Sequence, residues 1–311
     1  SNAMQMKFKG HQSFAVRKGW LGKGLRTIAD PDNSALLMPS NSKVAMDELG
    51  LGSNQVVALR YWMQTLGLVQ YKTGGRSREH ELTSLGELVY DKDPYTEELG
   101  TLWALHCNLA CACEDAASWY YFFNEFGMSV FTREDFTRGL ERYVFTNNDK
   151  KDVSLKSLED DFSCIINMYV PHARTGRRSG SPESVIDCPF GELGLVDVEN
   201  RGAKSYRKTG ANPATLPALL VLYCMCAMCQ RREEEGNPLG QEIRLGELLD
   251  SPCSPGKVFN LDAVGLLGKL YELENDGYVR INRTAGLDVV RLVDPDMNSI
   301  KCLERYYESI G

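Results

Sequence analysis

The chain has 311 residues, of which 43% are hydrophobic and 25% charged, a composition typical of a globular protein with a large core and not of a disordered one. Its formal net charge of −7 argues against indiscriminate binding to a nucleic-acid backbone, which needs clustered positive charge, but it allows a local basic face. No charge-free apolar run is long enough to span a membrane and no signal-peptide pattern is present, so we expect a cytoplasmic protein without a membrane partner.

The N-terminal segment is unusual in composition. Residues 1–3 have the sequence of an expression-tag remnant, so the native chain is expected to begin at Met4. Residues 8–24 combine basic, aromatic and glycine residues, which suggests either a loop that presents them to a phosphate or a base, or an arm that docks its aromatic side chains in the core. Among the four histidines, only His11 lies in a segment that could expose its side chain to a substrate, which makes it a candidate catalytic residue.

Residues 42–85 give the clearest fold signal. Their pattern predicts a helix over 42–49, a tight turn, a helix over 54–66 with Asn54 as N-cap, and a hairpin of strands 68–72 and 79–83 closed by a glycine turn. Gly67 is expected to end the longer helix in the left-handed conformation. A buried stripe is expected at Val56, Leu59, Met63 and Leu66. This order of helix, turn, helix and β-wing resembles the winged-helix superfamily.

A DNA-binding face is expected on this first winged helix. The outward face of its long helix should carry Asn54, Val57, Tyr61, Gln64 and Thr65. Neutral polar groups there can contact base edges, and basic groups on the wing can contact phosphates. The residues expected to contact duplex DNA are Arg60, Tyr61, Gln64, Lys72, Arg76 and Arg78. The alternative is that this unit serves packing or protein contacts only.

The middle of the chain is expected to be mainly helical. An apolar stripe over 97–126 contains Leu102, Leu105, Leu109 and Trp119; further helices are expected over 132–144, capped by Thr132 with Asp135, and over 155–169. The loop 172–180 is basic, and its Arg174, Arg177 and Arg178 are expected to add phosphate contacts. A strand pair over 194–208 and an apolar helix over 213–232 follow, and the polar break at 233–238 is read as a domain boundary.

The C-terminal part repeats the winged-helix pattern. A short helix over 243–249 and a helix over 260–274 precede a hairpin that ends near Leu292, with Ala263, Leu266, Leu267, Leu270 and Leu273 expected inward. Its outward residues, Asp262, Gly265, Lys269 and Glu272, include carboxylates that would repel phosphates, so we expect a protein-contact module. The predicted class is mainly α with small β-wings, with winged helix-turn-helix domains at both ends of a helical body. The expected ranges are 4–95, 96–238 and 239–311.

Metal and hydrolytic chemistry have weak support. The cysteines at 107, 111 and 113 and at 224, 226 and 229 lie in apolar helical runs, where cysteine behaves as a small hydrophobe, so we expect core packing and neither a metal nor a cofactor. No nucleophile elbow, Walker loop, zinc-protease motif or dinucleotide fingerprint is present. Glu183, Asp187 and Glu192 form the one acidic set outside clear helices, and Asp187 is the second catalytic candidate.

Three segments resemble a bacterial family known as domain of unknown function 4007. They are GH-x-SF-x-x-R-x-GWL-x-KG, which ends at Gly24, DDFSC-x-x-x-x-Y over 160–169, and SPES-x-x-D-x-PF-x-ELGL over 181–195. The motif positions are His11, Ser13, Arg17, Trp20, Lys23, Ser181, Glu183, Asp187, Pro189 and Phe190. Genes of this family tend to lie beside genes for enzymes resembling phosphoadenosine-phosphosulfate reductase, which implies DNA sulfur modification and phage defence.

The resemblance and the basic face together suggest a function. We expect a DNA-binding accessory component of a bacterial DNA sulfur-modification (phosphorothioation) or phage-defence system, with DNA and proteins of that system as partners. A relative in single-strand phosphorothioation systems is thought to nick DNA, so one alternative is a DNA nickase that uses the neighbourhood of His11 or Asp187. The others are a protein-interaction scaffold and a winged-helix transcription regulator.

Overall fold

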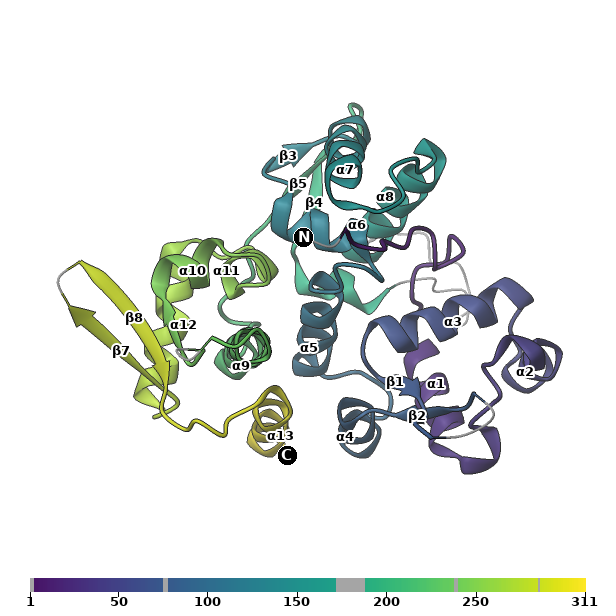
Figure 1. Ribbon diagram of the computed structural model, residues 1–311, viewed down its shortest axis with the longest axis horizontal. Helices are drawn as coiled ribbons and strands as arrows, with labels where there is room; N and C mark the ends of the chain where they lie inside the picture. Colours follow the sequence, from purple (N-terminus) through teal and green to yellow (C-terminus); the bar gives the residue numbers. More distant parts are fainter. Residues whose placement is uncertain (1–2, 75–77, 172–187, 238–239, 285) are drawn as a thin grey trace.

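The computed structural model describes residues 3–74, 78–171, 188–237, 240–284 and 286–311. Over these ranges the chain is mainly helical, with three small antiparallel sheets, as the predicted class requires (Figure 1). Figure 1 shows helix α3 and hairpin β1–β2 toward one end of the longest axis and hairpin β7–β8 at the other, with α5 and α9 between them. No helix in the described part of the chain is both long and apolar enough to cross a membrane.

The N-terminal elements agree closely with the sequence pattern. They are α1 (Trp20–Ala29), α2 (Ser42–Leu49), α3 (Ser53–Thr65), β1 (Val69–Tyr71), β2 (His80–Leu82) and α4 (Ser84–Lys92), with 3-10 turns at Pro31–Asn33 and Pro39–Asn41. The stripe predicted on α3 is buried, and Gly67 has the expected left-handed φ of +81°. The predicted N-cap is wrong: α3 begins one residue earlier, and Gln55 Oε1 accepts from the backbone N–H of Gly52 at 2.9 Å.

The predicted long helix over 97–126 is interrupted. The structure has α5 (Leu99–Ala110), α6 (Ala117–Tyr120) and a π-helical turn (Tyr121–Glu125). The Asn124 side chain donates to Ala110 O at 2.8 Å and so satisfies a carbonyl at the end of α5. Between the helices, the carbonyl groups of Glu114 and Asp115 accept hydrogen bonds from Lys7 N and Tyr61 Oη. The apolar stripe continues across the break, which is why periodicity does not reveal it.

The next helices and the second sheet follow the expectation. Helix α7 (Arg133–Asn147) has the predicted capping box, in which Thr132 Oγ1 and Asp135 Oδ2 accept from each other's backbone N–H. Helix α8 has the predicted bounds (Leu155–Tyr169). After a 3-10 turn (Pro189–Leu193), β4 (Val196–Asn200) and β5 (Ser205–Lys208) form the predicted pair, and β3 (Val130–Phe131) joins it in the order β3-β5-β4.

The C-terminal elements differ from the prediction in several places, and helix α13 was not predicted. They are α9 (Ala218–Glu234), β6 (Glu242–Arg244), α10 (Leu245–Asp250), α11 (Pro255–Val258), α12 (Ala263–Asn275), β7 (Val279–Thr284), β8 (Leu287–Leu292) and α13 (Ser299–Ile310). The predicted helix over 243–249 starts as strand β6, because Ile243 pairs with Val290 of β8. Lys269 was expected to face outward but is buried, with Nζ donating to Pro213 O at 2.7 Å, and Ala263 was expected inward but is exposed.

One hydrophobic core connects these elements. Its buried side chains extend from Met6 to Tyr307 and include residues of each predicted domain range. Helix α9 packs against α5, α12 and α13, and Thr101 Oγ1 of α5 lies 2.5 Å from Tyr307 Oη of α13. The two ends of the chain are therefore held by shared packing, and the domain boundaries stay predictions.

Candidate nucleic-acid interface

The hairpin β1–β2 is positioned by the end of α3. Gly67 turns the chain into β1, and Thr83 Oγ1 donates to Gly67 O at 2.5 Å, which fixes the base of the hairpin. The strands pair with Val69 opposite Leu82 and Tyr71 opposite His80. In this register Tyr71 and Lys72 are exposed while His80 is buried beneath them.

Basic groups gather around this hairpin. The exposed Arg78 guanidinium lies 5.6 Å from the centroid of the Tyr71 ring, and Tyr71 stacks on His80 with centroids 4.9 Å apart. Burial, and secondly the charge of Arg60, lowers the pKa of His80 to about 4. Lys72 contributes a further ammonium, although it pairs with Glu79 at 3.2 Å. The hairpin therefore carries the exposed basic side chains of Lys72 and Arg78, and the charge of Arg60 acts on its His80. Arg76 lies outside the described residues.

The outward face of α3 is less open than the sequence suggested. Thr65 is buried, and Tyr61 is half-buried, with its hydroxyl donating to Asp115 O at 2.7 Å. The Gln64 amide lies 3.1 Å from His80 Nε2 and donates to it, so neutral His80 carries its proton on Nδ1, which has no partner among the described residues. The expectation that this helix face is exposed to DNA bases is wrong for Thr65. Tyr61 and Gln64 already form hydrogen bonds within the protein.

His11 is buried, and the expectation that it is presented is wrong. Its ring is fully inaccessible and stacks on Trp62 with an interplanar angle of 18°. Nε2 donates to Asp161 Oδ1 at 2.7 Å, and Nδ1 accepts from Ser13 N at 3.0 Å, which defines the neutral tautomer. Ser118 Oγ donates to the other carboxylate oxygen of Asp161 at 2.6 Å. The structure thus joins the first and second family-like motifs at His11 and Asp161.

The remaining arm residues dock against the core, as one of the two interpretations expected. Trp20 is buried, and the Arg17 guanidinium lies 5.5 Å from the Phe14 ring and 5.4 Å from the Trp20 ring. Lys23 Nζ donates to Leu49 O at 2.8 Å and so satisfies a carbonyl at the end of α2. These motif residues hold α1, α2 and the arm together.

The third motif is described only in its second half. Phe190 is buried and its ring lies 5.6 Å from that of Tyr169, whose hydroxyl lies 2.7 Å from Nδ1 of buried His106. Pro189 opens the 3-10 turn that places Phe190. The positions outside the described residues are Ser181, Glu183 and Asp187 of this motif and Arg174, Arg177 and Arg178 of the basic loop.

The cysteines form a buried cluster drawn from both sequence triplets. Cys107 interacts with the thiols of Cys111 and Cys224, and Cys111 interacts with the thiol of Cys253, which the sequence pattern did not single out. Burial raises the pKa of Cys224, and the Cys111 thiol together with burial raises the pKa of Cys253. Thiols in this setting stay protonated and pack as small apolar groups. No group of three His, Cys, Asp or Glu side chains within the described ranges is arranged to hold a metal ion.

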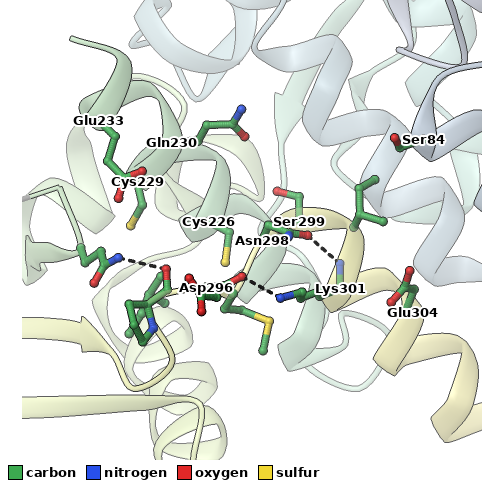
Figure 2. A pocket seen from close by; sticks show the side chains of 15 residues that line it. Ser84, Cys226, Cys229, Gln230, Glu233, Asp296, Asn298, Ser299, Lys301 and Glu304 are labelled. Atoms are coloured by element: carbon green, nitrogen blue, oxygen red, sulfur yellow. Dashed lines mark hydrogen bonds between the residues drawn. The ribbon is translucent and has the colours of Figure 1, made fainter. Parts of the chain in front are cut away.

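A cleft of about 660 Å³ lies where α9, α13 and the start of α4 meet (Figure 2). Its lining includes Glu233 of α9, Asp296 of the β8–α13 connection and Glu304 of α13, and Figure 2 shows Ser84 on the opposite side of the cleft from Glu233. No sequence pattern predicted this site. Its members are far apart in the chain and no local motif joins them.

Comparison with known proteins assigns a family. The family model described as protein of unknown function (DUF4007) matches residues 8–307, nearly the whole chain. The chain belongs to the DUF4007 family. This DUF4007 protein is similar to a crystal structure of SspB, with a TM-score of 0.78 and 25% identity over 99% of this chain and 95% of that one. It is also similar to a magnesium-ion-bound crystal structure of SspB, with a TM-score of 0.79 and 26% identity over 99% and 90% of the two chains. None of the curated proteins matches this DUF4007 protein.

Proposed function

We propose that this DUF4007 protein binds duplex DNA through its N-terminal helices and hairpin, as an accessory component of a bacterial DNA sulfur-modification or phage-defence system. In this proposal α1, α2, α3 and β1–β2 act as a winged helix, and the C-terminal elements around α12 and β7–β8 as a second one used for protein contacts. The observation that supports DNA binding best is the exposed Arg78 guanidinium 5.6 Å from the centroid of the exposed Tyr71 ring, on a hairpin that also carries Lys72 and whose His80 is acted on by the charge of Arg60.

The hairpin carries the phosphate contacts in this proposal. Arg78 is exposed and held over Tyr71, so its guanidinium is oriented before DNA arrives. Tyr61 and Gln64 already hydrogen-bond within the protein, so they support α3 and its neighbours instead of reading bases. Binding should therefore depend more on phosphates than on sequence, and it should weaken strongly as salt rises.

Fluorescence anisotropy across a salt series tests this. Arg60→Ala/Arg78→Ala should weaken binding to a labelled duplex and make the plot of log K against log salt shallower by about 2, since each lost phosphate contact removes about 0.9 from the slope. Arg280→Ala/Arg283→Ala removes the same charge from exposed positions of β7 and should change neither value. Equal losses in the two variants, or no binding by the wild type at low salt, would refute the proposal.

DNA nicking is the second candidate function, and one observation favours it: a similar solved structure is the magnesium-ion-bound form of SspB. The described residues of this chain do not supply a metal-holding group, so we derive no step through magnesium. Under this candidate, Asp187 is the predicted catalytic residue, whereas buried His11 holds the N-terminal arm through Asp161.

A plasmid assay separates nicking from binding alone. If the protein nicks DNA, it should relax supercoiled plasmid in the presence of magnesium ion and not with a chelator, and Asp187→Asn should abolish relaxation while duplex binding persists. Glu141→Gln, which neutralises an exposed carboxylate of α7 outside all three motifs, is the control. If the protein binds duplex DNA but does not relax the plasmid under these conditions, nicking is refuted and the accessory role still stands.

A further inference from the structure

The cleft in Figure 2 has the size of a ligand site and a polar lining. Helix α9 forms one wall with Gln230 and Glu233, and the β8–α13 connection and the first turns of α13 form the other. Its volume of about 660 Å³ falls in the range of sites that bind small molecules or short peptide segments. The buried thiols of Cys226 and Cys229, 4% and 5% exposed, also line it.

The charge of the lining is negative. The charged side chains of the lining are the carboxylates of Glu233, Asp296 and Glu304 and the ammonium of Lys301. Their net charge is −2. Lys301 Nζ donates to Asp296 O at 3.0 Å, so this ammonium is held against the backbone. The ion pairs found among the described residues include none of these three carboxylates, and all three are exposed. The cleft therefore attracts cations and repels a nucleic-acid backbone.

The start of α13 adds hydrogen-bond donors to the same cleft. Asn298 caps the helix by accepting from Lys301 N at 2.9 Å, while the backbone N–H groups of Ser299 and Ile300, in the first turn, have no intrahelical acceptor. Both residues line the cleft. Carbonyl oxygens of an extended peptide can accept from such groups, whereas a simple cation cannot.

We propose that this cleft binds a lysine- and arginine-rich segment of a partner protein. The carboxylates of Glu233, Asp296 and Glu304 receive its cationic side chains, and the first turn of α13 receives its backbone carbonyl groups. A peptide fits both features of the lining, and a small polycation fits only the first. This contact is separate from the hairpin surface and does not depend on DNA binding.

Binding of a labelled hexaarginine peptide to the full chain tests this by fluorescence anisotropy at moderate salt. The variant Glu233→Gln/Asp296→Asn/Glu304→Gln should bind the peptide about tenfold more weakly, as expected for the loss of three partly exposed ion pairs. The control Glu141→Gln/Asp149→Asn/Asp152→Asn removes the same charge from exposed positions on and after α7 and should stay within about twofold of the wild type.

The outcomes separate this proposal from its rivals. Equal weakening in both triple variants would show attraction by the overall charge and would overturn it. Displacement of the peptide by spermine at concentrations below those of unlabelled peptide would also overturn it and assign the cleft to a small polycation. The triple cleft variant should keep the urea midpoint and the duplex affinity of the wild type. Loss of peptide binding can therefore be told apart from unfolding and from loss of DNA binding.

Discussion

At the residue scale, Asp161 holds the N-terminal arm onto the helical body. The carboxylate is 1% exposed and accepts from Lys9 N, His11 Nε2 and Ser118 Oγ. The arm residues Lys9, Gln12 and Ser13 have positive φ values between 52° and 66°, a conformation that costs energy in non-glycine residues. The hydrogen bonds to Asp161 offset that cost and hold the arm against α8.

Asp161→Asn should lower the free energy of unfolding by about 2–3 kcal/mol, because it removes the negative charge that strengthens these three buried hydrogen bonds and leaves one side-chain oxygen in place of two. Urea denaturation followed by circular dichroism measures this. Asp152→Asn is the control: Asp152 is an exposed carboxylate just before α8, so its substitution should cost less than about 1 kcal/mol. Similar losses for the two variants would contradict the role given to Asp161.

At the element scale, Lys208 links the second sheet to the helical body through hydrogen bonds. Lys208 of β5 donates to Phe122 O at 2.5 Å and Phe126 O at 2.6 Å, at the end of the π-helical turn, and Nζ lies 4.7 Å from the Phe122 ring centroid. Burial, and secondly the charge of Lys257, lowers the pKa of Lys208 to about 7. Either protonation state retains the N–H groups that the two carbonyl groups need.

Lys208→Met should destabilise the protein by about 1–3 kcal/mol, because it leaves two carbonyl groups at the end of the π-helical turn without a donor. Lys204→Met, on the exposed hairpin turn between β4 and β5, is the control and should be close to neutral. Thermal and urea unfolding measure both. Hydrogen exchange should show the loss of protection concentrated in β3, β5 and the π-helical turn, and uniform loss would argue against a local fastening role.

At the scale of the whole molecule, buried histidines make stability depend on pH. Burial lowers the pKa of His106 to about 4, and burial together with Arg60 lowers that of His80 to about 4. His106 donates from Nε2 to Val258 O at 2.6 Å, so α5 is bound to α11 through its neutral ring. Because both pKa values lie below that of an unfolded histidine, the unfolded state binds more protons between about pH 6.5 and pH 4.

Stability should therefore be full above about pH 6.5 and fall as the pH decreases toward 4, with His106 alone accounting for about 3 kcal/mol of the loss once the pH is below its folded-state pKa. Urea unfolding at pH 7.5, 5.5 and 4.5 measures the slope. His80→Gln removes one of the two groups and should give a shallower dependence than the wild type. A variant slope equal to that of the wild type would contradict the assignment.

The local elements were predictable from the sequence because their causes are local. The spacing of apolar residues predicted the bounds of α2 and α8 and the buried stripe of α3. Gly67 and the Thr132–Asp135 capping box were predictable because a left-handed turn and a cap need only neighbouring residues. The three quoted motifs likewise predicted the family, since motif letters do not depend on the fold.

The candidate sites depended on contacts between distant residues, which no local pattern encodes. His11 and Asp161 are 150 positions apart, and only the packing of the arm on α8 makes the histidine a buried support instead of a presented group. Strand β6 exists because β8 lies beside it, and the break between α5 and α6 exists because the arm and Tyr61 use the carbonyl groups there. The cleft lined by Glu233, Asp296 and Glu304 likewise formed only when α9 packed against α13. The sequence by itself determined the locally encoded elements, such as α2, α8 and the capping box of α7, and the family. The tertiary structure alone decided which polar groups are buried, which are paired and which remain open to a partner.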